Sequence, residues 1–293
     1  MLAKASSFLS SVFQGVGTPS LVLSLDAGNV LSYPGTGATW SDLTIFNNDT
    51  FFTTSNNPTY SVSGGGSFQF GDVDDAFILS ATANGFPLGD SQYTIETWIN
   101  PDNLSQYSAL VLYGTLGTNT ANSIGINNNN IVIDWANNVL SSPTQSMIPG
   151  NWYYIASTYD GTDRKIYLNG SLIASDTPGV TNSVEFGDYF TIGNFMGLSF
   201  TGKISIVKLH TKALSGSRLL SNFNSLKTRF GYTFGSMTLN GSNSYLSSTS
   251  ADYAFGLNDF TVESFFKAGT SSNLSGIISL RGSRASVMST PAL

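Results

Sequence analysis

Residues 151–175 read Asn-Trp-Tyr-Tyr-Ile-Ala-Ser-Thr-Tyr-Asp-Gly-Thr-Asp-Arg-Lys-Ile-Tyr-Leu-Asn-Gly-Ser-Leu-Ile-Ala-Ser. The residues before the Asp-Gly pair are dense in aromatic and β-branched side chains, which favour β-strands. The Asp-Gly and Asn-Gly pairs accept the positive φ angles of tight hairpin turns. The stretch therefore predicts three short antiparallel strands. Such a meander cannot bury its own apolar face, so a second sheet must cover it.

Runs of the same kind recur along the chain, separated by Gly, Pro, Asn and Asp, as is typical of strands. We expect strands at residues 21–26, 67–70, 76–80, 93–100, 109–113, 123–126, 131–135, 189–192 and 203–209. One helix follows at 215–231, where Ser215 is a candidate N-cap and Gly231 a candidate C-terminal stop. Because no helical pattern lies between the strands, the sequence predicts an all-β protein with two antiparallel sheets.

The central stretch also carries a family resemblance. Trp-x-x-Ile-Ala-x-Thr-Tyr-Asp-Gly at 152–161 and Ile-Tyr-Leu-Asn-Gly at 166–170 resemble the central hairpins of laminin-G-like modules. Further motifs resemble that family in the same order, at residues 66–75, 93–101, 191–194 and 202–215. The resemblance covers residues 21–231 and implies a concanavalin A-like jelly roll, an antiparallel two-sheet sandwich.

Two segments are similar to a narrower group. Residues 21–43 and 213–231 resemble laminin-G-like modules in structural proteins of tailed bacteriophages. This resemblance implies a non-enzymatic protein of the virion surface, such as a capsid decoration, knob or tail-fibre component with a lectin-like domain. Its partners would be other virion proteins and a cell-surface glycan. The alternative is a carbohydrate-binding module of a secreted, extracellular bacterial protein.

The chain outside residues 21–231 divides into two further parts. Residues 1–20 carry a helical apolar stripe, and we expect an N-terminal arm that packs on the domain or a partner. A secretory signal is the rival, but serines break its apolar run. Residues 232–293 repeat the pattern of 66–114 and then stop, so they predict a partial second laminin-G-like copy. Either the chain is a piece of a longer one, or these strands pair with another subunit. We expect the second arrangement, in a homo-oligomer.

Composition excludes several classes of protein. Charged residues make up 10% of the chain and aromatic residues 13%, against about 25% charged in ordinary soluble domains. With no cysteine, the chain has no disulfide framework and no thiolate zinc site. No apolar run is long enough for a transmembrane helix. We therefore expect no membrane insertion. No cluster of Lys and Arg alternates with aromatic residues, so we also expect no nucleic-acid binding.

The charge is unevenly distributed along the chain. Residues 1–163 contain one cation and twelve acids, whereas residues 164–293 contain eleven cations and six acids. If strands from both halves interleave in one sandwich, the asymmetry averages out in space. The other interpretation of the asymmetry is that a basic segment at the C-terminal end of the module docks on an acidic neighbour.

Carboxylates suggest two kinds of chemistry. Asp72, Asp74 and Asp75 follow a predicted strand and could supply oxygens to calcium, although a turn capped by carboxylates explains them as well. Otherwise we expect no cofactor. Glycosidases of this fold need two carboxylates across the scissile bond, commonly on alternate residues of one strand. The residue two positions beyond Glu96 is Trp98, so that pair is absent. Glu96 is therefore expected to be a structural hydrogen-bonding group. We expect no enzyme.

Two residue types remain as candidates for other roles. His210 is the one histidine, and we interpret it as a substituted aromatic rather than part of a catalytic triad. Trp98 and Trp152 are expected in the core. The candidate ligand-binding residues surround another tryptophan, because a ring beside amide and carboxylate groups suits a sugar. These residues are Trp135, Asp134, Asn137 and Asn138.

Overall fold

The structure is a computed structural model that describes residues 20–52, 57–71, 75–79, 83–115, 117–185 and 189–232. All of these belong to the first of the two units into which the chain divides, Met1–Gly235. The second unit, Ser236–Leu293, lies outside the described residues, as does most of the predicted arm. The arm, the partial second copy and the homo-oligomer stay predictions.

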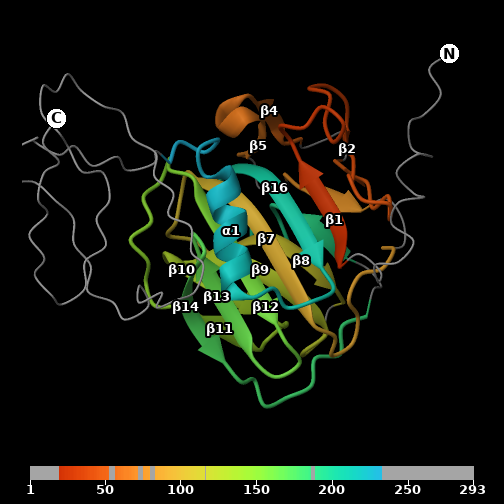
Figure 1. The fold of residues 1–293 in the computed structure, drawn as a ribbon, viewed down its shortest axis with the longest axis vertical. Helices are drawn as coiled ribbons and strands as arrows, with labels where there is room; N and C mark the ends of the chain where they lie inside the picture. The colour runs from red at the N-terminus through yellow and green to blue at the C-terminus, as the bar shows by residue number, and fades with distance from the viewer. Residues whose placement is uncertain are drawn as a thin grey trace, which may run out of the picture. The chain divides into compact units, whose positions relative to one another are not determined.

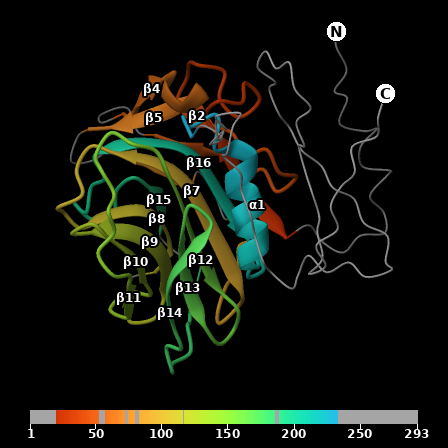
Figure 2. The ribbon, with the colours of Figure 1, turned by 60° about the vertical axis from the view of Figure 1, so that its left-hand side comes forward.

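Two antiparallel sheets of eight strands each form the fold (Figures 1 and 2). Sheet A has the order β14-β13-β12-β7-β16-β5-β4, and β1 also pairs with β16. Its strands are β1 (Leu21–Asp26), β4 (Thr59–Ser61), β5 (Ser67–Phe70), β7 (Tyr93–Pro101), β12 (Tyr153–Tyr159), β13 (Arg164–Leu168), β14 (Ser171–Asp176) and β16 (Gly202–His210).

Sheet B has the order β11-β10-β9-β8-β15-β6-β3-β2. Its strands are β2 (Thr39–Trp40), β3 (Thr50–Phe51), β6 (Phe77–Leu79), β8 (Ser108–Gly114), β9 (Ala121–Asn127), β10 (Asn130–Asp134), β11 (Val139–Ser141) and β15 (Tyr189–Ile192). The predicted all-β, antiparallel two-sheet jelly-roll sandwich is confirmed. A short 3-10 turn, η2 (Ser63–Gly65), precedes β5.

The predicted meander is β12-β13-β14, and β12 extends it by pairing with β7. Asn169 and Gly170 connect β13 to β14 with φ angles of 52° and 81°. Two consecutive positive φ angles define a type I′ turn, whose twist matches that of the flanking strands. The Asn-Gly pair therefore sets this hairpin, as the sequence indicates.

The main core lies between the two sheets and combines side chains from both. Because successive residues of a strand point to opposite faces, alternate residues enter this core. On β7 these are Tyr93, Ile95 and Ile99, which are fully buried. Aromatic rings dominate the core, including those of Trp40, Phe68, Phe77 and Trp135.

A second apolar layer lies on the outer face of sheet A, beneath helix α1 (Gly216–Leu226). In Figure 2 the order across the molecule is sheet B, sheet A, then α1. Ser215 caps the helix by accepting a hydrogen bond from the Arg218 amide, as predicted. The helix ends at Leu226 rather than near Gly231. Among the described residues, no helix is long and apolar enough to cross a membrane.

Two tryptophans differ in their burial. Trp98 is 1% exposed and stacks on Phe230 with ring centroids 3.9 Å apart. Trp152 precedes β12 instead of belonging to it, and it is half-buried against the ring of Phe230. The prediction that Trp152 is a core residue is therefore wrong, because it lies at the edge of the layer beneath α1.

Acids of the first half of the chain pair with cations of the second half. Arg229 forms a salt bridge to Asp26 at 2.8 Å, and Lys165 forms one to Asp160 at 3.0 Å. Within the described residues, the interleaving interpretation of the charge asymmetry is the one that these contacts support.

Candidate functional site

The four predicted ligand-binding residues do not form one site. Asp134 is the last residue of β10, and Ile131 and Ile133 of that strand point into the main core. Strand alternation therefore places Asp134 on the outer face of sheet B, while Trp135 lies in the core. The two residues point in opposite directions.

Trp135 has no exposed surface. Its Nε1–H donates to the Tyr93 hydroxyl at 3.0 Å, and the ring of Tyr159 packs on it edge to face. The guanidinium of Arg164 lies 4.5 Å from the centre of its ring. The ring cannot stack on a sugar in this conformation, so the structure gives Trp135 a core role in place of the predicted binding role.

Asn137 and Asn138 form the turn after β10. Asn137 is exposed and has a φ of 71°. Asn138 holds Arg164, since its carbonyl and Oδ1 accept from the guanidinium at 2.9 and 3.0 Å. Asn138 is thus occupied by the fold, whereas Asn137 is available to a ligand and stays a candidate.

Asp134 has a partner that the sequence did not indicate. The Tyr107 hydroxyl, from the loop before β8, donates to Asp134 Oδ2 at 3.0 Å. Asp134 Oδ1 is buried and has no hydrogen-bond partner among the described residues. Burial, and then the negative charge of Asp134, raises the pKa of Tyr107. A carboxylate with one unsatisfied oxygen therefore lies beside an aromatic ring.

The predicted calcium residues are tested in part. Asp72 and Asp74 lie outside the described residues. Asp75 is buried, and its Oδ2 accepts from the Gly71 amide at 2.7 Å, as expected of a turn capped by a carboxylate. Within the described ranges, no group of three or more His, Asp or Glu could hold a metal ion. Calcium binding here stays a prediction.

A second carboxylate cluster lies on the outer face of sheet A, beneath α1. Glu96 of β7 is 2% exposed, and its Oε1 lies 2.7 Å from His210 Nε2 of β16. Its Oε2 accepts from the Tyr154 hydroxyl of β12 and, at 2.9 Å, from Asn222 Nδ2 of α1. The expected structural role of Glu96 fits these contacts. His210 is a polar partner of Glu96, and its interpretation as a substituted aromatic stays a prediction.

Electrostatics keep Glu96 ionised. Burial alone would raise its pKa, but the hydrogen bond and charge of His210, with the Tyr154 hydrogen bond, leave the pKa lowered. Burial, and then the charge of Glu96, raises the pKa of Tyr154. The cluster therefore consists of a carboxylate with hydrogen bonds to both oxygens and a tyrosine that remains protonated.

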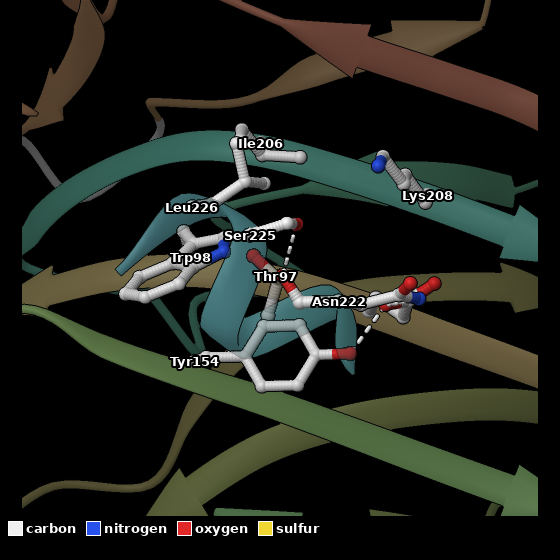
Figure 3. A pocket seen from close by; sticks show the side chains of 9 residues that line it. Thr97, Trp98, Tyr154, Ile206, Lys208, Asn222, Ser225 and Leu226 are labelled. Carbon is white, nitrogen blue, oxygen red and sulfur yellow. Dashed lines mark hydrogen bonds between the residues drawn. The ribbon is translucent and has the colours of Figure 1, made fainter. Parts of the chain in front are cut away.

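A small cavity adjoins this cluster, and Figure 3 shows the side chains of β7, β12, β16 and α1 that line it. Its volume is about 30 Å³, which is enough for one or two water molecules. Ligand pockets typically measure about 300–1,000 Å³. No second carboxylate contacts Glu96 or lines the cavity within the described part of the chain. The cavity is too small for a sugar, and the described residues around it lack the pair of acids that glycoside hydrolysis requires.

Comparison with known proteins identifies relatives of the fold. A laminin-G family model, described as the concanavalin A-like lectin/glucanases superfamily, matches residues 72–219. The binding domain of botulinum neurotoxin serotype G is similar, with a TM-score of 0.55 and 13% identity, over 70% of this chain and 51% of that one. No curated protein sequence matches the chain.

Two further solved structures are similar at the same level. The binding domain of Paraclostridial Mosquitocidal Protein 1 has a TM-score of 0.53 and 16% identity, over 70% of this chain and 52% of that one. The ligand-binding domain of botulinum neurotoxin serotype D, in complex with N-acetylneuraminic acid, has a TM-score of 0.52 and 15% identity, with coverage of 70% and 51%. The chain spans about half the length of these structures. Identities this low establish a shared fold.

Proposed function

The chain belongs to the concanavalin A-like lectin/glucanases superfamily, and from this premise we propose that it is a non-enzymatic, lectin-like binding protein. The observation that carries the proposal is the state of Glu96. Its carboxylate accepts three hydrogen bonds beneath α1, next to a cavity of about 30 Å³. A catalytic acid must reach its substrate, and among the described residues Glu96 has neither the access nor a second carboxylate beside it.

The ligand class that we propose is a cell-surface glycan. A similar binding domain was solved in complex with N-acetylneuraminic acid, which supports a sugar as a ligand for this type of domain. The chemistry of Asp134 and Tyr107 also suits a sugar, because carboxylates accept from hydroxyl groups and aromatic rings stack on apolar C–H faces.

The setting that we propose is the virion surface of a tailed phage, as a capsid decoration, knob or tail-fibre component that contacts other virion proteins and further copies of itself. The two segments that resemble phage modules, residues 21–43 and 213–231, meet in the fold. Arg229 Nη1 donates to Asp26 Oδ2 at 2.9 Å, and Arg229 Nε donates to the Gly64 carbonyl at 2.7 Å. The Arg229 side chain also occupies the space that a Cβ at Gly28 would need. This contact joins the two segments that resemble phage modules, which supports treating them as one structural feature.

Two experiments test the proposal. Purified protein is incubated with immobilised and soluble glycans, and both binding and release of reducing sugar are measured. We expect binding without turnover; turnover that disappears in Glu96→Gln would contradict the non-enzymatic assignment. The proteins of purified virions are then identified by mass spectrometry. If the protein is absent from the virions and found in the medium of bacterial cultures, the alternative of an extracellular carbohydrate-binding module replaces the virion role.

A further inference from the structure

We propose that strand β14 pairs edge to edge with β14 of a second copy of this chain, so that sheet A continues from one subunit into the next. This inference rests on the self-contact in the proposed function and names the surface that makes it. The surface consists of the free edge of β14 (Ser171–Asp176) with the exposed side chains of Leu172 and Leu220 beside it.

β14 is an edge strand that no other described element covers. It ends the order of sheet A and pairs with β13 alone. In the order of the described sheets, the other end strands are β4, β11 and β2, with three, three and two residues, whereas β14 has six. Among the described residues, no backbone hydrogen bond joins β14 to an element other than β13. The N–H and C=O groups on its free side can therefore pair with another strand.

β1 shows how this fold covers an edge of the same length. It has six residues and pairs with β16 on one side. On the other side, the Ser24 carbonyl accepts from the Leu43 amide at 2.9 Å, and the Ser24 amide donates to Asp42 Oδ1 at 2.8 Å. Asn48 Nδ2 donates to the Val22 carbonyl at 2.8 Å. The described part of the chain provides no such loop for β14.

The side chains of β14 and its neighbour α1 are accessible. All six residues of β14 are exposed or half-buried, and Leu172 is 54% exposed. Leu220 of α1, 44% exposed, borders the strand, since a Cβ on Gly170 would lie 2.7 Å from the Leu220 Cα. Leu172 pairs with Tyr167, which packs beneath α1, so both leucines lie on the outer face of sheet A. In Figure 1, β14 lies towards the lower left of the sandwich, at the end of this sheet.

β14 carries little of the protection that natural edge strands have. Its six residues include neither Lys nor Pro, which commonly keep exposed edges apart. A bulge falls in its pairing with β13, at the register shift between Ile166 and Tyr167, and it bends the strand without covering it. A long open edge invites uncontrolled pairing, whereas closed pairing about a two-fold axis occupies the edges of two chains at once.

The charges of β14 favour a second copy as the partner. Asp176 is its single charged side chain, and Arg164 of β13 binds both of its oxygens, at 3.0 and 2.5 Å. In an antiparallel pair about a two-fold axis, full overlap places Asp176 opposite Ser171, so like charges do not meet. The other five residues of the strand are neutral. The edge therefore complements itself.

The first test is sedimentation of the full chain and its variants at about 1–100 μM, because one strand pair with a few apolar contacts forms a small interface. We expect the wild type to associate as its concentration rises. Leu172→Lys places a charge on the edge and should weaken self-association by about tenfold or more. Val62→Lys is the matched control. Val62 is 82% exposed and follows β4, at the opposite end of sheet A, so this variant should associate like the wild type.

Hydrogen–deuterium exchange of the full chain at low and high concentration locates the contact. We expect slower exchange in residues 171–176 at high concentration, because their outer amides then donate to the second copy, and no change in β4. Leu172→Lys should remove the difference, and Val62→Lys should keep it. Because this measurement is local to β14, it distinguishes this contact from the association expected through residues 232–293.

The outcomes separate this inference from the proposed function. Thermal unfolding establishes that each variant is folded, and Ser175→Lys, on the same exposed edge, replaces Leu172→Lys if that variant does not fold. A chain that associates equally well after the substitution, with exchange in β14 independent of concentration, retains the proposed self-contact and overturns this surface. A chain that is monomeric over the whole range overturns both the self-contact and this inference, and leaves the glycan-binding assay as the test of the lectin-like function.

Discussion

Each sheet has on its outer face a carboxylate that accepts a hydrogen bond from a tyrosine hydroxyl. The two carboxylates differ in their other hydrogen-bond partners. On sheet A, Glu96 accepts from Tyr154 and is also bonded to His210 and Asn222 beneath α1. On sheet B, Asp134 accepts from Tyr107 and retains a buried oxygen without a donor among the described residues. Both oxygens of Glu96 have donors, whereas Asp134 Oδ1 has none among the described residues, and within the Glu96 network only His210 Nδ1 shares that lack.

The difference shows that the surroundings of a carboxylate decide its role. A buried charge that is fully hydrogen-bonded holds elements together, and removing it leaves several polar groups unpaired. A charge with unsatisfied acceptor positions has bonding capacity left for a ligand. We therefore assign Glu96 to the attachment of α1, whereas the described contacts give Asp134 no such structural role.

The largest expected contrast is in stability. Glu96→Ala leaves the buried groups of Tyr154 and His210, and the half-buried Asn222, without their acceptor. We therefore expect it to lower the free energy of unfolding by about 3–5 kcal/mol. Asp134→Ala should lower it by less than about 1 kcal/mol. Urea unfolding of both variants measures this directly. Equal losses would show that the two carboxylates have the same structural role.

A smaller contrast separates the two tyrosines. Tyr154→Phe removes a buried hydrogen bond to a charged group, and we expect a loss of about 1.5–3 kcal/mol in the free energy of unfolding. Tyr107→Phe should cost about 0.5 kcal/mol or less, because water can reach that loop. Thermal denaturation at a fixed pH tests this pair, and a larger loss for Tyr107→Phe would reverse the assignment.

The smallest contrast is in pH dependence. The folded-state pKa of Glu96 lies below its ordinary value near 4.5. Glu96 therefore contributes stability above that value and loses the contribution as the pH falls through the folded-state pKa. We expect the wild type to lose stability on acidification below about pH 4.5 more steeply than Glu96→Gln does. Identical slopes of stability against pH would show that the Glu96 network does not form.

The sequence predicted the sandwich because its longer strands carry strong signals. Residues 21–26, 67–70 and 189–192 are strands with the boundaries that were expected. The short strands β2, β3 and β11 have two or three residues. Periodicity cannot be recognised over so few residues, and their pairing partners define them instead. Tertiary context, rather than local pattern, made these strands.

The binding residues were harder to predict for a related reason. Alternation along 131–135 was a usable signal, since Ile131 and Ile133 share a face with Trp135 and exclude Asp134 from it. The contact between Asp134 and Tyr107 joins residues 27 positions apart, and that between Glu96 and His210 joins residues 114 apart. A single sequence holds no information on such distant pairs, so the partners of both carboxylates required the structure.

We propose that Glu96 holds α1 on sheet A through its hydrogen bonds and is not a ligand-binding group. Hydrogen–deuterium exchange of the full chain, with and without a neutral oligosaccharide that it binds, tests this most directly. We predict that the bound oligosaccharide leaves exchange in α1 and β16 unchanged, because the cavity beside Glu96 has a volume of only about 30 Å³. Slower exchange in α1 and β16 in the presence of the oligosaccharide would show instead that ligand binds at the Glu96 cluster.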